Sequence, residues 1–162
     1  MKSIFTLFLG MVWCSLAYVS QAQNQVFSLV SQQDHSLVIS VKDGDLAVLD
    51  VDSEHDKNSQ KFILKRLING NIMIASAAHP ERCFKHTGTT VELAALDEHT
   101  ADFEWKIEYI ANDEYLFKHA ALTNQCLAIE DNQLIVAPIH LNRRKPHRGC
   151  CRFVLIPEDN PF

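Results

Sequence analysis

An internal repeat is the feature of this sequence that most restricts its fold, because repeats of 20–50 residues indicate an architecture built from similar units. The segment AAHPERCF covers residues 77–84, and AALTNQCL covers residues 120–127, 43 positions further along. Residues 72–84 align with residues 115–127 without a gap. A weaker first copy, residues 25–37, aligns with both and places Ser36 where the other copies have a cysteine. Three copies of about 45 residues are therefore expected.

Each copy has the pattern of short β-strands. Apolar residues alternate at period two, as in Val91 and Leu93, and polar turns such as KDGD, HTGTT and EDNQ separate the segments. No segment after residue 22 shows a sustained helical stripe. The sequence predicts an all-β fold of three four-stranded units. The β-trefoil fits this prediction, because a closed threefold arrangement covers strand edges that would otherwise aggregate.

One aromatic residue anchors the closing segment of each copy. These residues are Phe62, Trp105 and Phe153, which are spaced by 43 and 48 positions. Their equivalent places in the repeat predict that all three are buried core residues.

The first 22 residues have the layout of a secretory signal peptide. Lys2 precedes an apolar run at residues 4–19, and Ser20 and Ala22 provide small residues for cleavage before Gln23. The bulky residue before the cysteine of this run does not suit a lipoprotein. We therefore expect a secreted chain, neither transmembrane nor lipidated, with residues 23–162 forming one domain.

Four cysteines remain after residue 22, and an exported chain favours disulfides. They are Cys83, Cys126, Cys150 and Cys151. Four cysteines allow three pairings. Because Cys126 and the adjacent pair lie in the same expected unit, we predict that Cys150 or Cys151 bonds to Cys126. The other cysteine of the adjacent pair can reach Cys83 only if the hairpins meet near the threefold axis.

No residue pattern predicts catalysis, a metal or a cofactor. The eight histidines are His35, His55, His79, His86, His99, His119, His140 and His147. None forms a pair at the short spacing of metal motifs, and most fall in or beside expected turns, so solvated surface positions are predicted. No nucleophile has an evident partner base. Loss of the first 22 residues removes one lysine and no acid and changes the net charge from −5 to −6, which disfavours direct nucleic-acid binding.

One basic segment stands out in this acidic chain. The stretch NRRKPHR places Arg143, Arg144, Lys145, His147 and Arg148 in one expected loop. Such a loop is either solvated surface or an anion-binding site for sulfated glycans, acidic lipid headgroups or an acidic protein face.

The repeat resembles those of ricin-type β-trefoil lectins and, within them, the accessory C-type subunit of cytolethal distending toxins. The segments VFSLVS, RCFKHTGTT, EYLFKHAALTNQCLAI and FVLIPEDNPF carry this resemblance. It implies a secreted, non-catalytic chain that recognises a glycan or membrane at the cell surface. It also implies two possible partners, a nuclease subunit and a second trefoil subunit.

The chain departs from the lectin pattern at two kinds of position. Lys85 and Ala128, with Val38 in the first copy, replace the acidic residue that grips a sugar hydroxyl in those lectins. Leu96 and Ile139 stand where partner cysteines would fall. Two alternatives therefore stay open. One is a stand-alone secreted lectin, and the other is a trefoil ligand of a protein receptor, similar to fibroblast growth factors or interleukin-1-like cytokines.

The basic loop provides a direct test. Replacing Arg143, Arg144 and Lys145 with alanine should weaken retention on heparin and on cells without lowering the melting temperature, because exposed charge pairs contribute only about 0–1 kcal/mol to stability. Wild-type retention should also fade with salt, as the Debye length falls from about 10 Å at 0.1 M to about 3 Å at 1 M. Equal retention of both proteins at every salt concentration would assign the loop to solvated surface.

Overall fold

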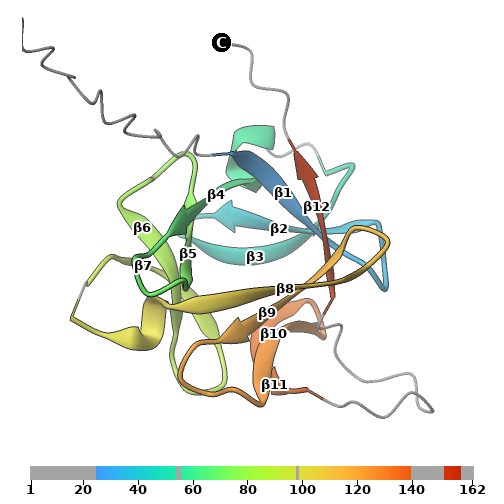
Figure 1. The fold of residues 1–162 in the computed structure, drawn as a ribbon. Helices are drawn as coiled ribbons and strands as arrows, with labels where there is room; N and C mark the ends of the chain where they lie inside the picture. The colour runs from blue at the N-terminus through green and yellow to red at the C-terminus, as the bar shows by residue number, and fades with distance from the viewer. Residues whose placement is uncertain (1–24, 54–55, 98, 140–151, 158–162) are drawn as a thin grey trace, which may run out of the picture.

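A computed structural model describes residues 25–53, 56–97, 99–139 and 152–157 of the chain (Figure 1). The predicted all-β class is confirmed. The first four strands are β1 (Val26–Ser31), β2 (Leu37–Lys42), β3 (Asp45–Asp50) and β4 (Lys61–Arg66). The next four are β5 (Ile72–Ser76), β6 (Arg82–His86), β7 (Val91–Ala95) and β8 (Trp105–Ala111). The last four are β9 (Glu114–His119), β10 (Gln125–Glu130), β11 (Gln133–Pro138) and β12 (Phe153–Pro157).

The helical content of the described residues consists of two short 3₁₀ turns, η1 (Lys57–Gln60) and η2 (Ala101–Phe103), which precede β4 and β8. Neither turn is long enough or apolar enough to cross a membrane.

Six of the strands form a closed ring. β1 pairs with β4 and β12, β5 pairs with β4 and β8, and β9 pairs with β8 and β12. The other six strands form the hairpins β2–β3, β6–β7 and β10–β11, and the second strands of these hairpins contact one another. Because the ring closes, each of its six strands has a partner on both sides, which removes the exposed edges that favour aggregation.

Equivalent backbone hydrogen bonds show that the three repeats fold alike. In each repeat, the amide just beyond the first strand donates to the carbonyl just before an aromatic anchor. These bonds are Gln32 N to Arg152 O, Ala77 N to Lys61 O and Ala120 N to Glu104 O, at 3.0, 2.9 and 3.0 Å. A second set closes each hairpin: Val51 N to Ser36 O, Leu96 N to Glu81 O and Ile139 N to Asn124 O.

The strand register corrects the alignment of the first copy. Val30 pairs with Val38, as Ala75 pairs with Cys83. Lys118 pairs with Cys126 in the same way. Val38 therefore occupies the cysteine position, and the placement of Ser36 there was wrong by two residues.

The physical reason for this correction is burial. The cysteine position faces the interior, where Val38 is 1% exposed, whereas Ser36 lies in an exposed turn and donates to Asp34. The same shift of two residues applies to the position where the lectins carry an acidic residue. In the first copy this position holds Ser40, not Val38. This serine is buried, and its hydroxyl lies 2.8 Å from that of Ser59.

Tight turns join the strands of several hairpins through residues with positive φ. Asn112 and Asp113 (φ 50° and 61°) link β8 to β9, and Asp131 and Asn132 (φ 49° and 58°) link β10 to β11. Asn and Asp tolerate this left-handed region because their short polar side chains bond locally, and such turns match the twist of the flanking strands.

The predicted aromatic anchors form the centre of the core. Phe62, Trp105 and Phe153 are completely buried. The ring of Phe62 meets Phe84 edge-on at 5.1 Å between centroids, and the indole nitrogen of Trp105 donates to the Phe84 carbonyl at 3.3 Å. The indole therefore fills the core and satisfies its polar atom, as buried tryptophan requires.

The cysteines of the second and third units occupy equivalent buried places. Cys83 and Cys126 are not bonded to each other, and no disulfide joins any two of the described residues. Cys150 and Cys151 lie outside the described residues, as does the expected signal peptide at residues 1–22. The bridge from Cys126 to one of that pair stays a prediction.

Removing the central indole tests this core. Trp105→Ala should lower the free energy of unfolding by about 3–5 kcal/mol, because it creates a cavity and leaves the Phe84 carbonyl without its donor. Ile68→Ala is the control, since Ile68 is fully exposed in the β4–β5 turn and should change stability by no more than about 0.5 kcal/mol. Urea unfolding curves that coincide for wild type and Trp105→Ala would contradict this core.

Candidate functional site

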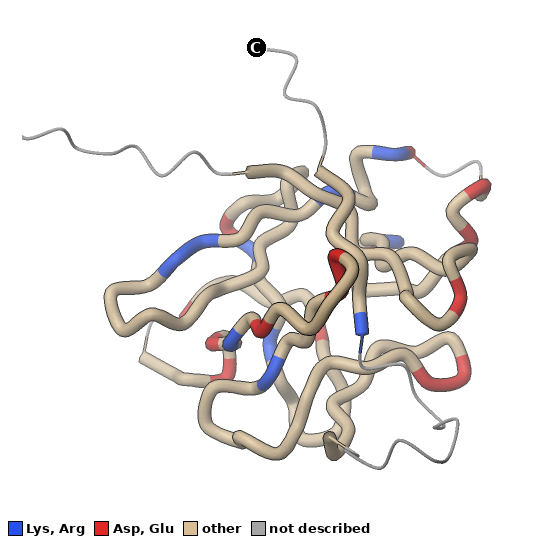
Figure 2. Tube along the Cα trace, turned by 45° about the vertical axis from the view of Figure 1, so that its right-hand side comes forward, with Lys and Arg blue, Asp and Glu red and all other residues tan. Residues whose placement is uncertain are grey.

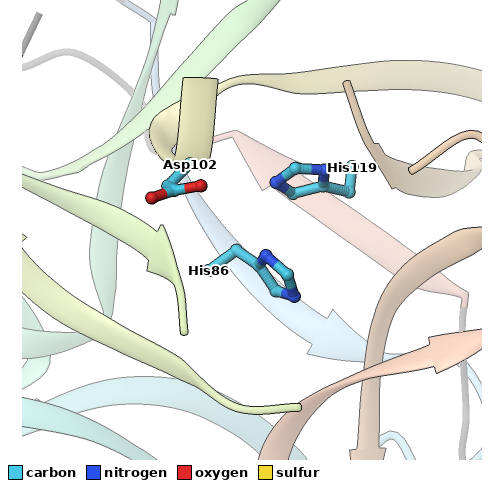
Figure 3. Close-up of side chains that lie close together, drawn as sticks. All are labelled: His86, Asp102 and His119. Carbon is cyan, nitrogen blue, oxygen red and sulfur yellow. The ribbon is translucent and has the colours of Figure 1, made fainter. Parts of the chain in front are cut away.

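Two histidines and an aspartate from distant parts of the sequence meet beside the second hairpin (Figure 3). His86 ends β6, Asp102 lies in η2, and His119 ends β9. One side-chain atom of each residue lies within 4.8 Å of the corresponding atoms of the other two. Figure 3 shows the two rings and the carboxylate turned toward a common space. We call these three residues the His–Asp–His cluster.

His119 is the buried member of the cluster, at 2% exposure. Its Nδ1 accepts the backbone N–H groups of Ala121 at 3.3 Å and Leu122 at 3.2 Å. Its Nε2 is buried and has no hydrogen-bond partner among the described residues. The rings of His119 and Trp105 form a T-shaped pair with 5.5 Å between centroids. An Nδ1 that accepts two N–H bonds carries no proton, so the proton of the neutral ring is on Nε2.

His86 is held by the end of its own hairpin. Its Nε2 lies 2.6 Å from the carbonyl oxygen of Gly88 and therefore donates to it. Gly88 has φ +90°, a conformation that side chains rarely adopt. The hydroxyls of Thr87 and Thr90 lie 2.7 Å apart and hold the two sides of the turn together. The ring of His86 then lies 4.5 Å from that of His119.

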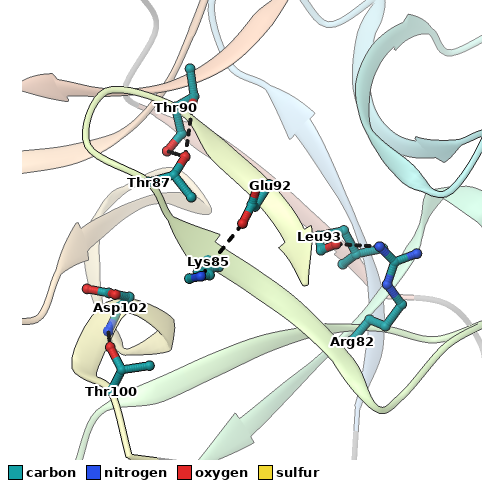
Figure 4. A network of polar contacts seen from close by, with 8 residues as sticks. All are labelled: Arg82, Lys85, Thr87, Thr90, Glu92, Leu93, Thr100 and Asp102. Atoms are coloured by element: carbon teal, nitrogen blue, oxygen red, sulfur yellow. Dashed lines mark hydrogen bonds and ion pairs between the residues drawn. The ribbon is translucent and has the colours of Figure 1, made fainter. Parts of the chain in front are cut away.

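Asp102 is positioned by a local cap (Figure 4). Thr100 Oγ1 accepts the backbone N–H of Asp102 at 3.2 Å, which caps the short η2 turn. Beside it, Lys85 forms an ion pair with Glu92 at 3.8 Å and lies over the ring of Phe103. The carboxylate of Asp102 is thus directed at the histidines, while the nearby lysine has another partner.

The surroundings keep His119 uncharged near neutral pH. Burial lowers the pKa of His119 below its ordinary 6.5, and the neighbouring charge of His86 lowers this pKa further. Asp102 acts in the opposite direction. Desolvation disfavours the charged form of an imidazole, which explains why the burial effect is the largest. The expectation that His119 is a solvated surface residue was therefore wrong.

The spacing of the cluster alone would suit a cation, but the hydrogen bonds of His119 do not. A metal needs the lone pair of an imidazole nitrogen, and a ligating histidine normally donates its other ring N–H. In His119, Nε2 carries the proton, and Nδ1 accepts hydrogen bonds from two backbone amides. The neutral ring thus presents an N–H group to the cluster, so we do not assign a metal centre there.

A second candidate site is a groove at the end of the barrel where β1 begins, away from the hairpins. Its volume is about 580 Å³. It is lined by Gln25, Phe27, Leu64, Arg66, Asp113, Tyr115, Val154, Leu155, Ile156 and Pro157. Tyr109, which is 60% exposed, packs edge-on against Tyr115 at 5.5 Å, and Ile156 is 47% exposed. The groove therefore has an apolar floor and rim, with one cation and one anion among its walls.

The basic segment NRRKPHR, for which the sequence left open a solvated surface or an anion-binding site, lies outside the described residues. Its basic residues are Arg143, Arg144, Lys145, His147 and Arg148. Along the described trace, lysines and arginines occur singly or in short runs rather than as one continuous band (Figure 2).

The His–Asp–His cluster could not be predicted from the sequence, because its members stand at positions 86, 102 and 119, with no recognisable spacing.

Comparisons with known proteins place this fold among toxin and glycosidase domains. No protein-family model matches the chain, and neither does any curated protein. Its structure is similar to a mosquitocidal holotoxin, with 12% sequence identity and a TM-score of 0.71 over 85% of this chain and 18% of that chain. It is also similar to a GlcNAcα1-4Gal-releasing endo-β-galactosidase from Clostridium perfringens, with 9% identity and a TM-score of 0.70 over 83% of this chain.

The chain spans only a third of that glycosidase, at 33% of its length. A third similar structure is the cytolethal distending toxin from Actinobacillus actinomycetemcomitans, with 10% identity and a TM-score of 0.67. This match covers 82% of the present chain and 91% of the toxin chain. At these identities the comparisons show a shared all-β fold.

Zinc titration tests the absence of a metal centre. Zn²⁺ should leave the melting temperature unchanged at neutral pH, because His119 presents N–H rather than a lone pair to the cluster. A site occupied at 100 times its Kd would instead stabilise the fold by about 2.7 kcal/mol. A zinc-dependent rise in melting temperature that disappears in His86→Gln would contradict this assignment.

Proposed function

We propose that the chain is a β-trefoil of the ricin B-like type that acts as a secreted, non-catalytic binding subunit of a toxin. The closed ring of six strands, the three hairpins and the equivalent hydrogen bonds of the three repeats support the trefoil. The function proposed is recognition, because folds of this kind host many activities and only the sites discriminate among them.

The single observation that carries the toxin proposal is the extent of one structural match. The chain covers 91% of a cytolethal distending toxin chain, whereas it covers 18% and 33% of the holotoxin and the glycosidase. Because this match extends over nearly a whole toxin chain, it supports a role for the present protein as a separate chain of similar size. It would hold a nuclease subunit and a second trefoil subunit, and it would bind a cell-surface glycan or membrane.

The groove is the face proposed for the partner chains. Ile156 and Tyr115 line this groove, and the exposed Tyr109 packs against Tyr115 at its side. Aromatic residues are enriched at the centres of protein interfaces, and the apolar floor can be buried with them. Arg66 and Asp113 in its walls provide one cation and one anion for polar contacts. The basic loop at residues 142–148 is proposed to face the cell surface.

The described reactive groups support a non-catalytic role. The Nδ1 of His119 is occupied by backbone amides, so it is not free to act as a base. Burial raises the pKa of the Cys83 thiol, which lowers its thiolate fraction and its nucleophilicity. The lectin acid position carries Ser40, Lys85 and Ala128, so the sugar site proposed is a shallow one of a different kind.

A stand-alone secreted lectin is the second candidate function, and a ligand of a protein receptor is the third. The genomic neighbourhood separates both from the toxin proposal, which requires adjacent genes for a nuclease and a sister trefoil chain.

Co-expression with those two neighbouring chains gives the experimental test. The three chains should co-elute in size-exclusion chromatography, and Tyr109→Ser with Ile156→Ser should weaken the complex by about 2 kcal/mol or more, the usual cost of losing a central anchor. Leu122→Ser is the matched control, because Leu122 is 39% exposed but does not line the groove.

Two results would contradict the proposal. The first is a genome with no nuclease gene beside this one. The second is co-elution of the groove variant with an affinity equal to that of wild type and of Leu122→Ser.

A further inference from the structure

One turn is capped by a side chain at the same place in all three repeats, but the third repeat uses a different residue. The first strand of each unit ends in Ser31, Ser76 or His119, and all three are at most 2% exposed. Each accepts the backbone N–H three residues further along. The donors are Asp34, His79 and Leu122, and each bond measures 3.2 Å.

These caps differ in how they respond to protons. A serine hydroxyl accepts a hydrogen bond throughout the physiological pH range, whereas a histidine nitrogen accepts one only while it is unprotonated. Protonation of His119 would place a proton on Nδ1, directly opposite the N–H groups of Ala121 and Leu122. The cap would then become a repulsive contact between donors.

We propose that His119 makes the turn between β9 and β10 a proton-sensitive element, which is closed when the ring is neutral and opens when the ring is protonated. The corresponding turns of the first two units, capped by Ser31 and Ser76, stay closed. Mild acid therefore loosens the third unit alone. This inference goes beyond the proposed function and does not depend on it.

The groups around His119 set the direction of this response. From the elements packed nearby, the charges that act on its ring are His86 on β6 and Asp102 in η2. Three ion pairs on the neighbouring strands occupy further charged groups: Lys85 with Glu92, Lys118 with Glu108, and Arg152 with Glu114. Trp105 on β8 adds an uncharged T-shaped ring contact.

The sign of the pH effect follows from linkage. The pKa of His119 in the closed turn is lowered from 6.5, and in the open, solvated turn it returns toward 6.5. The open turn consequently binds more protons. The closed turn is fully favoured above pH 6.5 and loses stability as the pH falls from 6.5 to the lowered pKa. Within that window, the opening constant rises by up to about tenfold per pH unit.

Amide hydrogen exchange measures this opening directly. Protection factors, which correct for the intrinsic pH dependence of exchange, should fall for the amides of Ala121 and Leu122 between pH 7.5 and pH 5. The equivalent amides of Asp34 and His79 are internal controls in the same sample and should keep their protection. In His119→Ser, which gives the third unit the cap of the other two, the Leu122 amide should lose its acid sensitivity.

Two further variants test the neighbours with opposite expected results. His86→Gln removes a charge that lowers the pKa of His119, so the sensitive window should narrow and the total loss of protection should shrink. Asp102→Asn removes the opposing charge, so the window should extend to lower pH and the loss should grow. Changes in the same direction for both variants would contradict the assigned roles.

The outcome that overturns the proposal is independent of any variant. If the protection factor of Leu122 in wild type changes between pH 7.5 and pH 5 no more than those of Asp34 and His79, the turn is not proton-sensitive. If His119→Ser retains the acid-induced loss, the loss comes from another group. Should that variant fail to fold, the comparison of the three wild-type amides still decides.

Discussion

The pairing of β1 with β12 is the constraint on which the rest of this structure depends. It joins the two ends of the described chain and turns a row of strands into a closed ring. Ring closure brings Phe62, Trp105 and Phe153 into one interior, where each is completely buried. The hairpins can then cover one end of the barrel, and the groove lies at the other, where β1 begins and β12 ends. Both candidate sites thus follow from the same closure.

Sequence reasoning succeeded where the repeat carries strong side-chain signals. Alternation predicted the strands, and the spacing of large aromatics predicted the core anchors. It failed in the first copy, where matching Ser36 to the cysteines ignored that the position is buried and must hold Val38. It also failed for His119, because the burial of this histidine depends on its contact with Trp105 on another strand, and the repeat spacing does not show which residues of two strands meet.

The candidate sites were harder to predict than the fold for a physical reason. The His–Asp–His cluster joins two strands and a 3₁₀ turn, and the groove joins strands from both ends of the chain. Such sites depend on the strand register, because a slip of one residue moves every side chain of a strand to the opposite face of the sheet. The substitution of histidine for serine at one of three equivalent caps became visible only after the register was known. That exception to the repeat distinguishes the third unit chemically from the other two.

Through-space NMR contacts between β1 and β12 test the central claim most directly. Closure predicts contacts between the backbone protons of Val30 and Val154 and of Leu29 and Leu155, which pair across the junction. Comparable contacts are expected at the β4–β5 and β8–β9 junctions, since all three belong to the same ring. Contacts at the other two junctions with none between β1 and β12 would show an open sheet and contradict the account.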